Sequence, residues 1–379
     1  MTRIDASCDA CASAAAPIDN EAKITDNRCP TEVVGEAHSS QQTNQKEGPQ
    51  PMLHIEDLAA PPEGFLRDEP EGAEFYQAFQ TARLDDFSFG YFAVYRDSAL
   101  VTVAPYFVMD FRLNTLLPSG WLKHSLSWIR FKLACIGHPT VDAGRIQGEV
   151  SQETLAAISA ALAKKGSLLA YKGFAEDLPL RGFVAAKGLP VPVLSIGPDY
   201  YQAMKSDRRN LLKRKLKKAA ALRYEECAGL PDHLVAKVHA LYLNTWQKAE
   251  LKFEKLTPEY FANTRSLSHY LLYFLDDELI GFTQLIGKGR HLVNRYIGLD
   301  YARSHEYGLY FAMFIRTVEF GIREGFEEIE LGATSYEFKR ILGARQIPTW
   351  NHYRHNNALV NWLLGKLRSV LEPSESELR

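Results

Sequence analysis

A lysine, a tyrosine and a glutamate lie close together in segment 326–343, which reads FEEIELGATSYEFKRILG. This pattern predicts a strand, an exit at Gly332 and a short helix. Substitution at a carbonyl group requires a proton acceptor, donors for the carbonyl oxyanion and a proton for the leaving group. Lys339 can stabilise the oxyanion, Tyr336 can supply the proton and Glu330 can accept one. These three residues are the predicted catalytic set.

Each of these residues also has an ordinary structural interpretation. Lys339 can be an exposed lysine on a short helix, and Tyr336, on the same helical face, can pack against the strand exit. Glu328 and Glu330 alternate with apolar residues, so they share a sheet face that lines either a cleft or solvent. No Ser-His-Asp order or Cys-His pair stands out, which favours direct attack without an acyl-enzyme.

The elements before this segment predict an antiparallel meander followed by a helix. Strand-like runs at 270–275, 279–286 and 291–299 are separated by the turn signals Asp276-Asp277 and Gly287-Lys-Gly-Arg290. Residues 308–323 have the length and period of an amphipathic helix. This order predicts an α+β fold, in which a ligand usually lies where strand ends meet a helix N-terminus.

The third strand-like run has polar residues on both faces. Strict alternation places Arg295 on one face and Asn294 and Tyr296 on the other. A strand that is covered on both sides is normally apolar throughout. Asn294, Arg295 and Tyr296 are therefore predicted to bind substrate.

A strongly basic segment at 205–223 separates two halves of the sequence. Its apolar residues recur at helical spacing, which predicts a helix with a cationic surface. Such a surface is either simply solvated or presents Arg208, Arg209 and Lys213 to a phosphate-bearing ligand.

The first half repeats the pattern of the second. We predict a hairpin, then alternating helices and strands, at 87–115, 152–165 (helix), 167–172 (strand), 176–187 (helix) and 191–196 (strand). The predicted organisation is a disordered tail at 1–52, an N-terminal half at 53–200 and a catalytic half at 201–379.

Residues 201–356 resemble the GNAT (acyl-CoA N-acyltransferase) superfamily, and more narrowly its FemAB-related, BioF2-like branch. The resemblance is carried by four features: Gly298-Leu-Asp300, the helix up to Arg323-Glu-Gly325, the strand ending at Gly332, and Tyr336-Glu-Phe-Lys339. It implies tandem GNAT-like (Fem-type) halves with mixed, mainly antiparallel sheets flanked by helices. It also implies that Lys339 holds a phosphate or an oxyanion, and that the Arg-rich helix faces the donor.

The resemblance implies acyl-CoA as co-substrate, with no tightly bound cofactor and with Arg303 and Gly308 as CoA contacts. GNAT enzymes wrap the pyrophosphate with a glycine-rich turn. Here Glu306 replaces its first glycine, and the negative charge opposes a pyrophosphate. Two alternatives therefore stay open: an aminoacyl-tRNA-dependent Fem-type transferase acting on a cell-envelope precursor, and a non-catalytic GNAT-like binding module.

Composition limits the remaining possibilities. The chain has 379 residues and a net charge of −2, so nothing attracts it globally to nucleic acid or membrane. Its five cysteines form no even framework, which favours a reducing, cytoplasmic location, and Cys8 and Cys11 lack a second ligand pair, so we predict no metal site. No membrane span is expected. The expected acceptor is a small-molecule or envelope-precursor amine, with tRNA as a possible partner and the oligomeric state left open.

Overall fold

The computed structural model describes residues 53–84, 87–112, 130–248, 254–375 and 377–378. The tail at 1–52 that the sequence predicts to be disordered, and the cysteines within it, lie outside these residues. Within the described part of the chain, no helix is both long and apolar enough to cross a bilayer.

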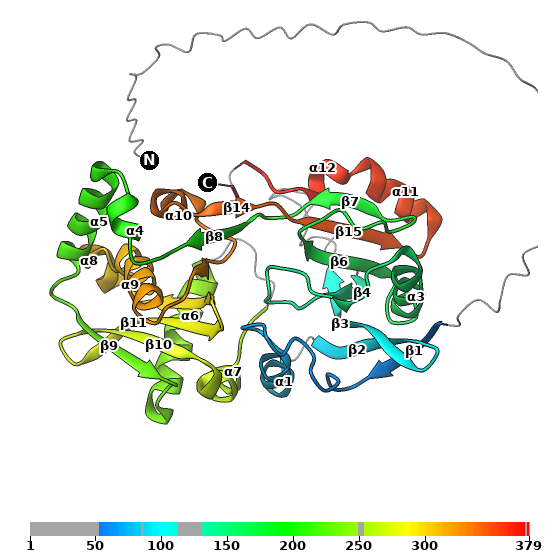
Figure 1. The fold of residues 1–379 in the computed structure, drawn as a ribbon, viewed down its shortest axis with the longest axis horizontal. Helices are drawn as coiled ribbons and strands as arrows, with labels where there is room; N and C mark the ends of the chain where they lie inside the picture. The colour runs from blue at the N-terminus through cyan, green and yellow to red at the C-terminus, as the bar shows by residue number, and fades with distance from the viewer. Residues whose placement is uncertain (1–52, 85–86, 113–129, 249–253, 376, 379) are drawn as a thin grey trace, which may run out of the picture. The chain divides into compact units, whose positions relative to one another are not determined.

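The described strands form two sheets (Figure 1). The first has the order β1-β2-β3-β4-β6-β15-β7, with β5 paired to β3. Its strands are β1 (Leu53–Leu58), β2 (Phe87–Arg96), β3 (Ala99–Arg112), β4 (Arg130–Ile136), β5 (Gln147–Gly148), β6 (Leu168–Phe174), β7 (Val184–Lys187) and β15 (Trp350–His355). The second has the order β14-β8-β13-β12-β11-β10-β9. Its strands are β8 (Val191–Ser195), β9 (Arg223–Ala228), β10 (His269–Leu275), β11 (Glu278–Lys288), β12 (His291–Leu299), β13 (Glu328–Glu330) and β14 (Arg345–Ile347).

Helices flank both sheets. They are α1 (Ala73–Thr81), α3 (Gln152–Leu162), α4 (Tyr200–Ala203), α5 (Ser206–Lys218), α6 (Val235–Lys248), α7 (Pro258–Thr264), α8 (Tyr301–Tyr307), α9 (Leu309–Arg323), α10 (Tyr336–Leu342), α11 (Ala358–Lys366) and α12 (Arg368–Leu371).

Each sheet contains the same unit. In the first sheet β2, β3 and β4 form an antiparallel meander, and β6 returns parallel to β4 after α3. In the second, β10, β11 and β12 form the meander, and β13 returns parallel to β12 after α9. The predicted α+β class with tandem, mainly antiparallel halves is therefore confirmed.

The two halves of the sequence exchange strands. β8 pairs with β13 and β14 of the second sheet, although it precedes residue 200. β15, near the C-terminus, pairs with β6 and β7 of the first sheet. The predicted boundary at 200/201 therefore does not separate the two sheets, because local patterns do not reveal which sheet a strand joins.

The predicted helix at 176–187 is wrong. Pro179 lacks the N–H that a helix interior needs, and Gly182 has a left-handed φ of 76°. The chain instead runs through irregular structure into β7.

The second sheet is covered on both faces. Apolar residues of α9, among them Leu309, Met313 and Val318, pack against one face. Residues of α6 and α7 pack with α1 against the other. α9 approaches closely enough that a Cβ on Gly281 would lie 2.8 Å from the side chain of Leu309. A gap between two strands of the second sheet is therefore enclosed by packed helices on both faces of that sheet.

Candidate functional site

β12 and β13 pair only briefly. The parallel register joins His291 to Glu328 and ends where Val293 pairs with Glu330. β13 stops there, whereas β12 continues to Leu299. The strands therefore separate beyond Val293, and Gly332 lies two residues past the end of β13. The strand predicted in 326–331 is confirmed, although it is shorter than expected.

A β-bulge in β12 changes the expected faces of its polar residues. Leu285 pairs with Asn294 and Gln284 pairs with Tyr296, so Arg295 is the extra residue. Asn294 donates from Nδ2 to Thr317 Oγ1 on α9, at 3.5 Å. Tyr296 lies on the opposite face, in contact with aromatic rings of α6 and α7. The prediction that Asn294 and Tyr296 share a face is wrong, because a bulge breaks the two-residue alternation.

Arg295 connects the second sheet to loops of the first half. Its Nη1 lies 2.9 Å from Glu71 Oε1, and its Nη2 donates to the carbonyl of Thr140. Both charged side chains are almost fully buried, at 7% and 9% exposure. Both terminal nitrogens of this guanidinium thus bond to groups of the protein itself. The predicted role of Arg295 in substrate binding stays a prediction.

Lys339 is buried rather than exposed. Its side chain donates from Nζ to the carbonyl of Gly332 at 2.7 Å and also to that of Thr334. Burial lowers the pKa of Lys339 to about 7, against a smaller opposite effect of Asp142. The alternative interpretation of Lys339 as an exposed lysine is wrong, because α10 folds back over the turn that precedes it. Through these two hydrogen bonds Lys339 instead stabilises the turn that follows β13.

Tyr336 is also buried on α10. Its hydroxyl donates to the carbonyl of Pro190 at 2.9 Å, and burial raises its pKa well above the ordinary value. The packing interpretation of Tyr336 therefore describes its position. Its predicted role as a proton donor stays a prediction.

Asp142 is a residue of this site that the sequence did not single out. Its Oδ2 accepts a hydrogen bond from the backbone N–H of Ala333 at 3.0 Å, so a loop of the first half holds the turn after β13. The sequence did not single out Glu71, the partner of Arg295, either. The signal available for Asp142 is an acidic residue in a loop that directly follows an apolar strand run, a common position for functional residues.

A cleft of about 300 Å³ opens beside these residues. It lies between the 69–71 and 141–145 segments of the first half and β8, β12 and β13 of the second sheet. Its lining residues are Glu69, Pro70, Glu71, Val141, Arg145, Val193, His291, Leu292, Val293, Glu328 and Glu330.

The two glutamates of β13 differ inside the cleft. Glu328 lies 3.4 Å from His291 Nδ1 and 3.2 Å from Arg345 Nη2. Glu330 has a buried Oε1 with no hydrogen-bond partner. Burial, followed by repulsion from Glu71 and Asp142, raises the pKa of Glu330 to about 8. Glu330 thus combines a raised pKa with a carboxylate oxygen that has no hydrogen-bond partner.

The basic segment forms α5, as predicted, and packs against α9. Leu212 is buried, whereas Arg208 and Lys213 are exposed. Arg209 is half-buried and donates to the carbonyl of Tyr201 at 3.0 Å. At the other end of the helix, Lys215 Nζ lies 3.6 Å from the ring centroid of Phe311 on α9. This end of α5 therefore lies beside the start of α9.

The segment expected to wrap a pyrophosphate is helical. α8 covers residues 301–307, and Asp300 caps it by accepting from the N–H groups of Ala302 and Arg303. Arg303 also pairs with Glu278. Gly308, with φ 60°, links α8 to α9, and no side chain caps α9. A helix engages its own N–H groups, so this segment does not form the open cradle of a glycine-rich turn.

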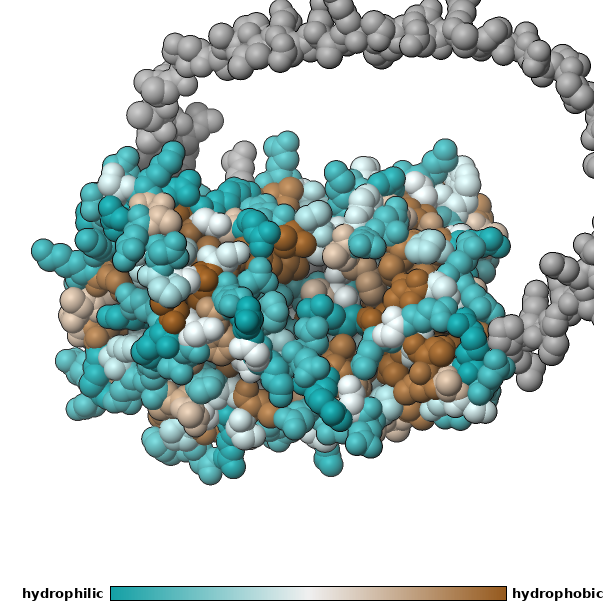
Figure 2. Space-filling model, viewed as in Figure 1, coloured by the Kyte–Doolittle hydropathy of each residue, from teal (hydrophilic) through white to brown (hydrophobic). Residues whose placement is uncertain are grey.

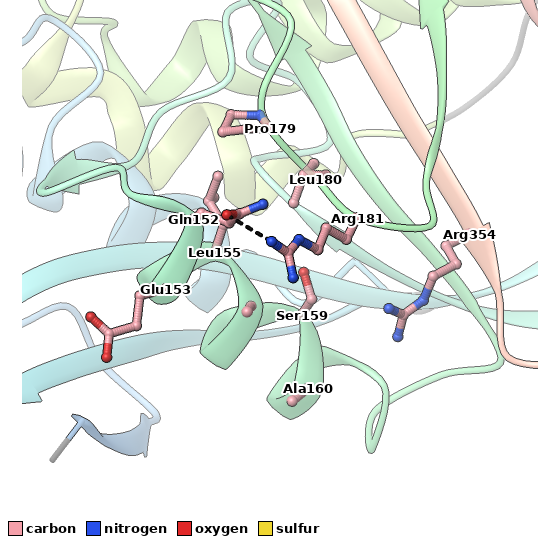
Figure 3. Close-up of a pocket in the computed structure, with 10 residues that line it drawn as sticks. Gln152, Glu153, Leu155, Ser159, Ala160, Pro179, Leu180, Arg181 and Arg354 are labelled. Atoms are coloured by element: carbon pink, nitrogen blue, oxygen red, sulfur yellow. Dashed lines mark hydrogen bonds between the residues drawn. The ribbon is translucent and has the colours of Figure 1, made fainter. Parts of the chain in front are cut away.

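A second cavity of about 500 Å³ lies against α3 in the first half (Figure 3). Leu155, Pro179 and Leu180 supply apolar walls, and Arg181 donates to Gln152 Oε1 at 3.1 Å. Apolar side chains gather on the part of the visible face that carries the first sheet (Figure 2). None of the predicted site residues lines this cavity.

Comparisons with known proteins concern the family and the fold of this chain. Residues 206–340 match the family model described as acetyltransferase (GNAT) domain. No curated protein matches the chain. The C-terminal domain of a putative lysylphosphatidylglycerol synthetase from Agrobacterium fabrum is similar in structure, at 13% identity over 80% of this chain and 92% of that chain, with a TM-score of 0.50. This likeness concerns the fold alone.

Two further solved structures are similar at lower scores. FemX has 11% identity over 76% of this chain and 92% of that chain, with a TM-score of 0.47. A tandem GNAT protein from the clavulanic acid biosynthesis pathway has 11% identity over 81% of this chain and 99% of that chain, with a TM-score of 0.42. The similarity to a GNAT acetyltransferase domain thus rests on the family-model match, which covers residues 206–340.

Proposed function

We propose that the chain is an N-acyltransferase that moves an acyl group, such as acetyl, from acyl-CoA to an amine held in the 300 Å³ cleft. The observation that carries this proposal is Glu330, a partly buried carboxyl group of raised pKa and with a free oxygen, at the point where β12 and β13 separate. The expected cytoplasmic location belongs to the same proposal.

Glu330 is the proposed proton acceptor. The amine nitrogen attacks the thioester carbonyl, a C–N bond forms, the C–S bond breaks, and the ammonium proton passes to the carboxylate. A base with a pKa near 8 takes this proton more readily than an ordinary carboxylate does. The departing thiolate then takes up a proton, for which Tyr336 is the donor that the sequence predicts.

Lys339 is proposed as a positioning residue. Its bonds to Gly332 and Thr334 fix the turn that begins at the end of β13, and Asp142 holds the same turn through Ala333. The shape of the opening between β12 and β13 depends on that turn. The role of Lys339 as an oxyanion donor, which the sequence predicts, stays a prediction.

A second candidate donor is aminoacyl-tRNA, with an amine of a cell-envelope precursor as acceptor. The observation that favours it is the helical α8, which replaces the phosphate-wrapping turn of CoA-dependent relatives. The cationic α5 lies beside the start of α9, and its lysine and arginine side chains could contact the phosphate backbone of a tRNA.

One experiment separates these candidates. Native mass spectrometry of freshly purified protein detects a retained donor, and calorimetric titration then compares acetyl-CoA with aminoacyl-tRNA. Binding of acetyl-CoA together with amine-dependent release of its thiol supports the first proposal. Binding of aminoacyl-tRNA alone supports the second. Binding of neither donor rejects both and leaves a non-catalytic binding module.

Replacement of Arg208 and Arg209 by alanine tests the basic helix. If α5 contacts donor phosphates, the double variant raises the KM of the donor more than it lowers kcat, and the difference shrinks as salt is added. Lys164→Ala, an exposed lysine beyond α3, is the control. Unchanged donor binding at low salt would show that α5 is only a solvated face.

Asp142→Asn tests the electrostatics of the cleft. The amide oxygen still accepts from Ala333, but the Asp142 charge, which adds to burial and to Glu71 in raising the pKa of Glu330, is gone. We expect the midpoint of the rise of kcat/KM with pH to move to lower pH. An unchanged midpoint would show that Asp142 does not act on the base.

A further inference from the structure

The cavity of about 500 Å³ in the first half combines an apolar wall with two arginines (Figure 3). The wall is formed by residues of α3 and of the loop between β6 and β7, namely Leu155, Ala156, Ala160, Pro179 and Leu180. Arg181 comes from the same loop and Arg354 from β15, and both side chains reach toward α3. A cavity of this size, mostly apolar and with a few polar groups, is typical of small-molecule sites.

Arg354 is half-buried, and its guanidinium has no hydrogen-bond or ion-pair partner among the residues that the structure describes. The other described arginines that are not exposed all bond to protein groups: Arg96 to Glu149, Arg145 to Glu69, Arg209 to the carbonyl of Tyr201, Arg295 to Glu71 and Arg316 to Glu319. Taking a guanidinium partly out of water without a partner costs free energy, which a bound anion would recover. Arg354 is therefore available to a ligand.

The side chain of Arg354 is held at the cavity by its surroundings. Its backbone belongs to β15, which lies between β6 and β7, and pairs with Leu169 of β6. Its guanidinium carbon lies 5.0 Å from the ring centroid of Phe183, which packs against a buried cluster of the first sheet. Arg181 donates to the neutral side chain of Gln152 at 3.1 Å, so its charge is not cancelled. Both cations are thus positioned without an acidic partner.

The acidic side chains near the cavity do not neutralise its arginines. Glu153, the one carboxylate among the described lining residues, lies 3.1 Å from Arg96 Nη2. Asp177 in the loop lies 2.8 Å from His352 Nε2, and neither Asp177 nor Glu176 lines the cavity. Two guanidiniums against one paired carboxylate leave the lining with a net positive charge.

We propose that this cavity binds a small amphipathic anion. The carboxylate or phosphate headgroup of the ligand pairs with Arg354 and Arg181, because a guanidinium donates two parallel hydrogen bonds to such groups. The apolar chain of the ligand lies against the wall formed by α3 and the loop, out of water. The cavity shares no lining residue with the 300 Å³ cleft, so the proposal does not depend on acyl transfer.

Calorimetric titration of the full chain is the test. The probes are octanoate and octyl phosphate, which carry both parts of the proposed ligand, and acetate and octanol, which carry one part each. We expect both amphipathic anions to bind, and acetate and octanol to bind about tenfold or more weakly. The tighter of the two amphipathic anions identifies the headgroup that the site prefers.

Arg354→Gln should weaken the binding of octanoate about tenfold or more, because a charge-assisted hydrogen bond is lost. The melting temperature of this variant should stay that of the wild type, since the guanidinium bonds to no described group. Ala160→Glu, at an exposed position of α3, keeps both arginines but brings a negative charge into the cavity, and should weaken binding similarly. Arg130→Gln, which changes an exposed arginine of the same sheet outside the cavity lining, is the matched control.

Three results would overturn the proposal. The first is no binding of octanoate or octyl phosphate to the wild type. The second is octanoate binding that Arg354→Gln and Ala160→Glu leave unchanged, or that Arg130→Gln weakens equally. The third is binding of acetate as tight as that of octanoate, which shows an adventitious ion only. If Arg354→Gln melts well below the wild type, Ala160→Glu decides, because it leaves both arginines in place.

Discussion

Glu330→Gln should lower turnover by a factor of about 10² to 10⁴, the usual contribution of a positioned general base. Glutamine keeps the size of the side chain but cannot accept the ammonium proton. Because Glu330 faces the cleft with one unpartnered oxygen, the substitution removes no described hydrogen bond of that atom. The measurement is the initial rate of thiol release from acyl-CoA with an amine acceptor.

Glu328→Gln is the matched control. It lies two residues earlier on the same strand, but its carboxylate is engaged by His291 and Arg345. We expect nearly full turnover from this variant. Equal losses in both variants, or full activity of a folded Glu330→Gln protein, would remove Glu330 from the mechanism.

The raised pKa of Glu330 also predicts two pH profiles. In the wild type, kcat/KM should rise with pH to a plateau above about 8, because only the ionised carboxylate accepts a proton. The contribution of Glu330 to the free energy of unfolding should instead fall as pH rises. A carboxyl group whose pKa is raised by folding imposes no cost below its unfolded pKa of about 4.3 and an increasing cost as pH rises toward the folded value. Glu330→Gln should therefore melt higher than wild type at pH 9, and the difference should vanish near pH 4.

Lys339→Met should lower turnover by a factor of about 10², the scale set by a displacement of the catalytic groups by about 1 Å. The variant leaves the carbonyls of Gly332 and Thr334 without their donor, so the free energy of unfolding should also fall, by about 1–3 kcal/mol. Methionine fills the space beside Phe314, which limits the loss of packing. Rates and denaturant melts measure the two effects.

A positioning role has one further consequence. The loosened turn no longer holds Asp142 through Ala333, so one of the charges that raise the pKa of Glu330 shifts, and the pH midpoint of activity should move. Lys165→Met, which removes a half-buried lysine of the first half, should leave that midpoint unchanged. A folded Lys339→Met protein with wild-type turnover would contradict any role of Lys339 in the reaction.

The sequence was sufficient for the local elements of the second half. The meander at 270–299, α9 and β13 follow from alternation, turn residues and helical period, which are properties of neighbouring residues. The same reasoning failed at 176–187, where the interruptions Pro179 and Gly182 outweigh the apolar pattern, and at Arg295, where a bulge interrupts the alternation. Neither the bulge nor the partners of β8 and β15 leave a local signal.

Sequence alone thus determined the type of fold, the basic helix and the carboxylate at the end of β13. Tertiary structure decided what surrounds those residues. The contacts of Glu71 with Arg295 and of Asp142 with Ala333 span 224 and 191 positions, and no local pattern specifies such pairs. Burial in the folded chain is what moves Glu330 to a raised pKa and Lys339 to a lowered one, because desolvation depends on all the atoms around a charge and not on its neighbours in sequence.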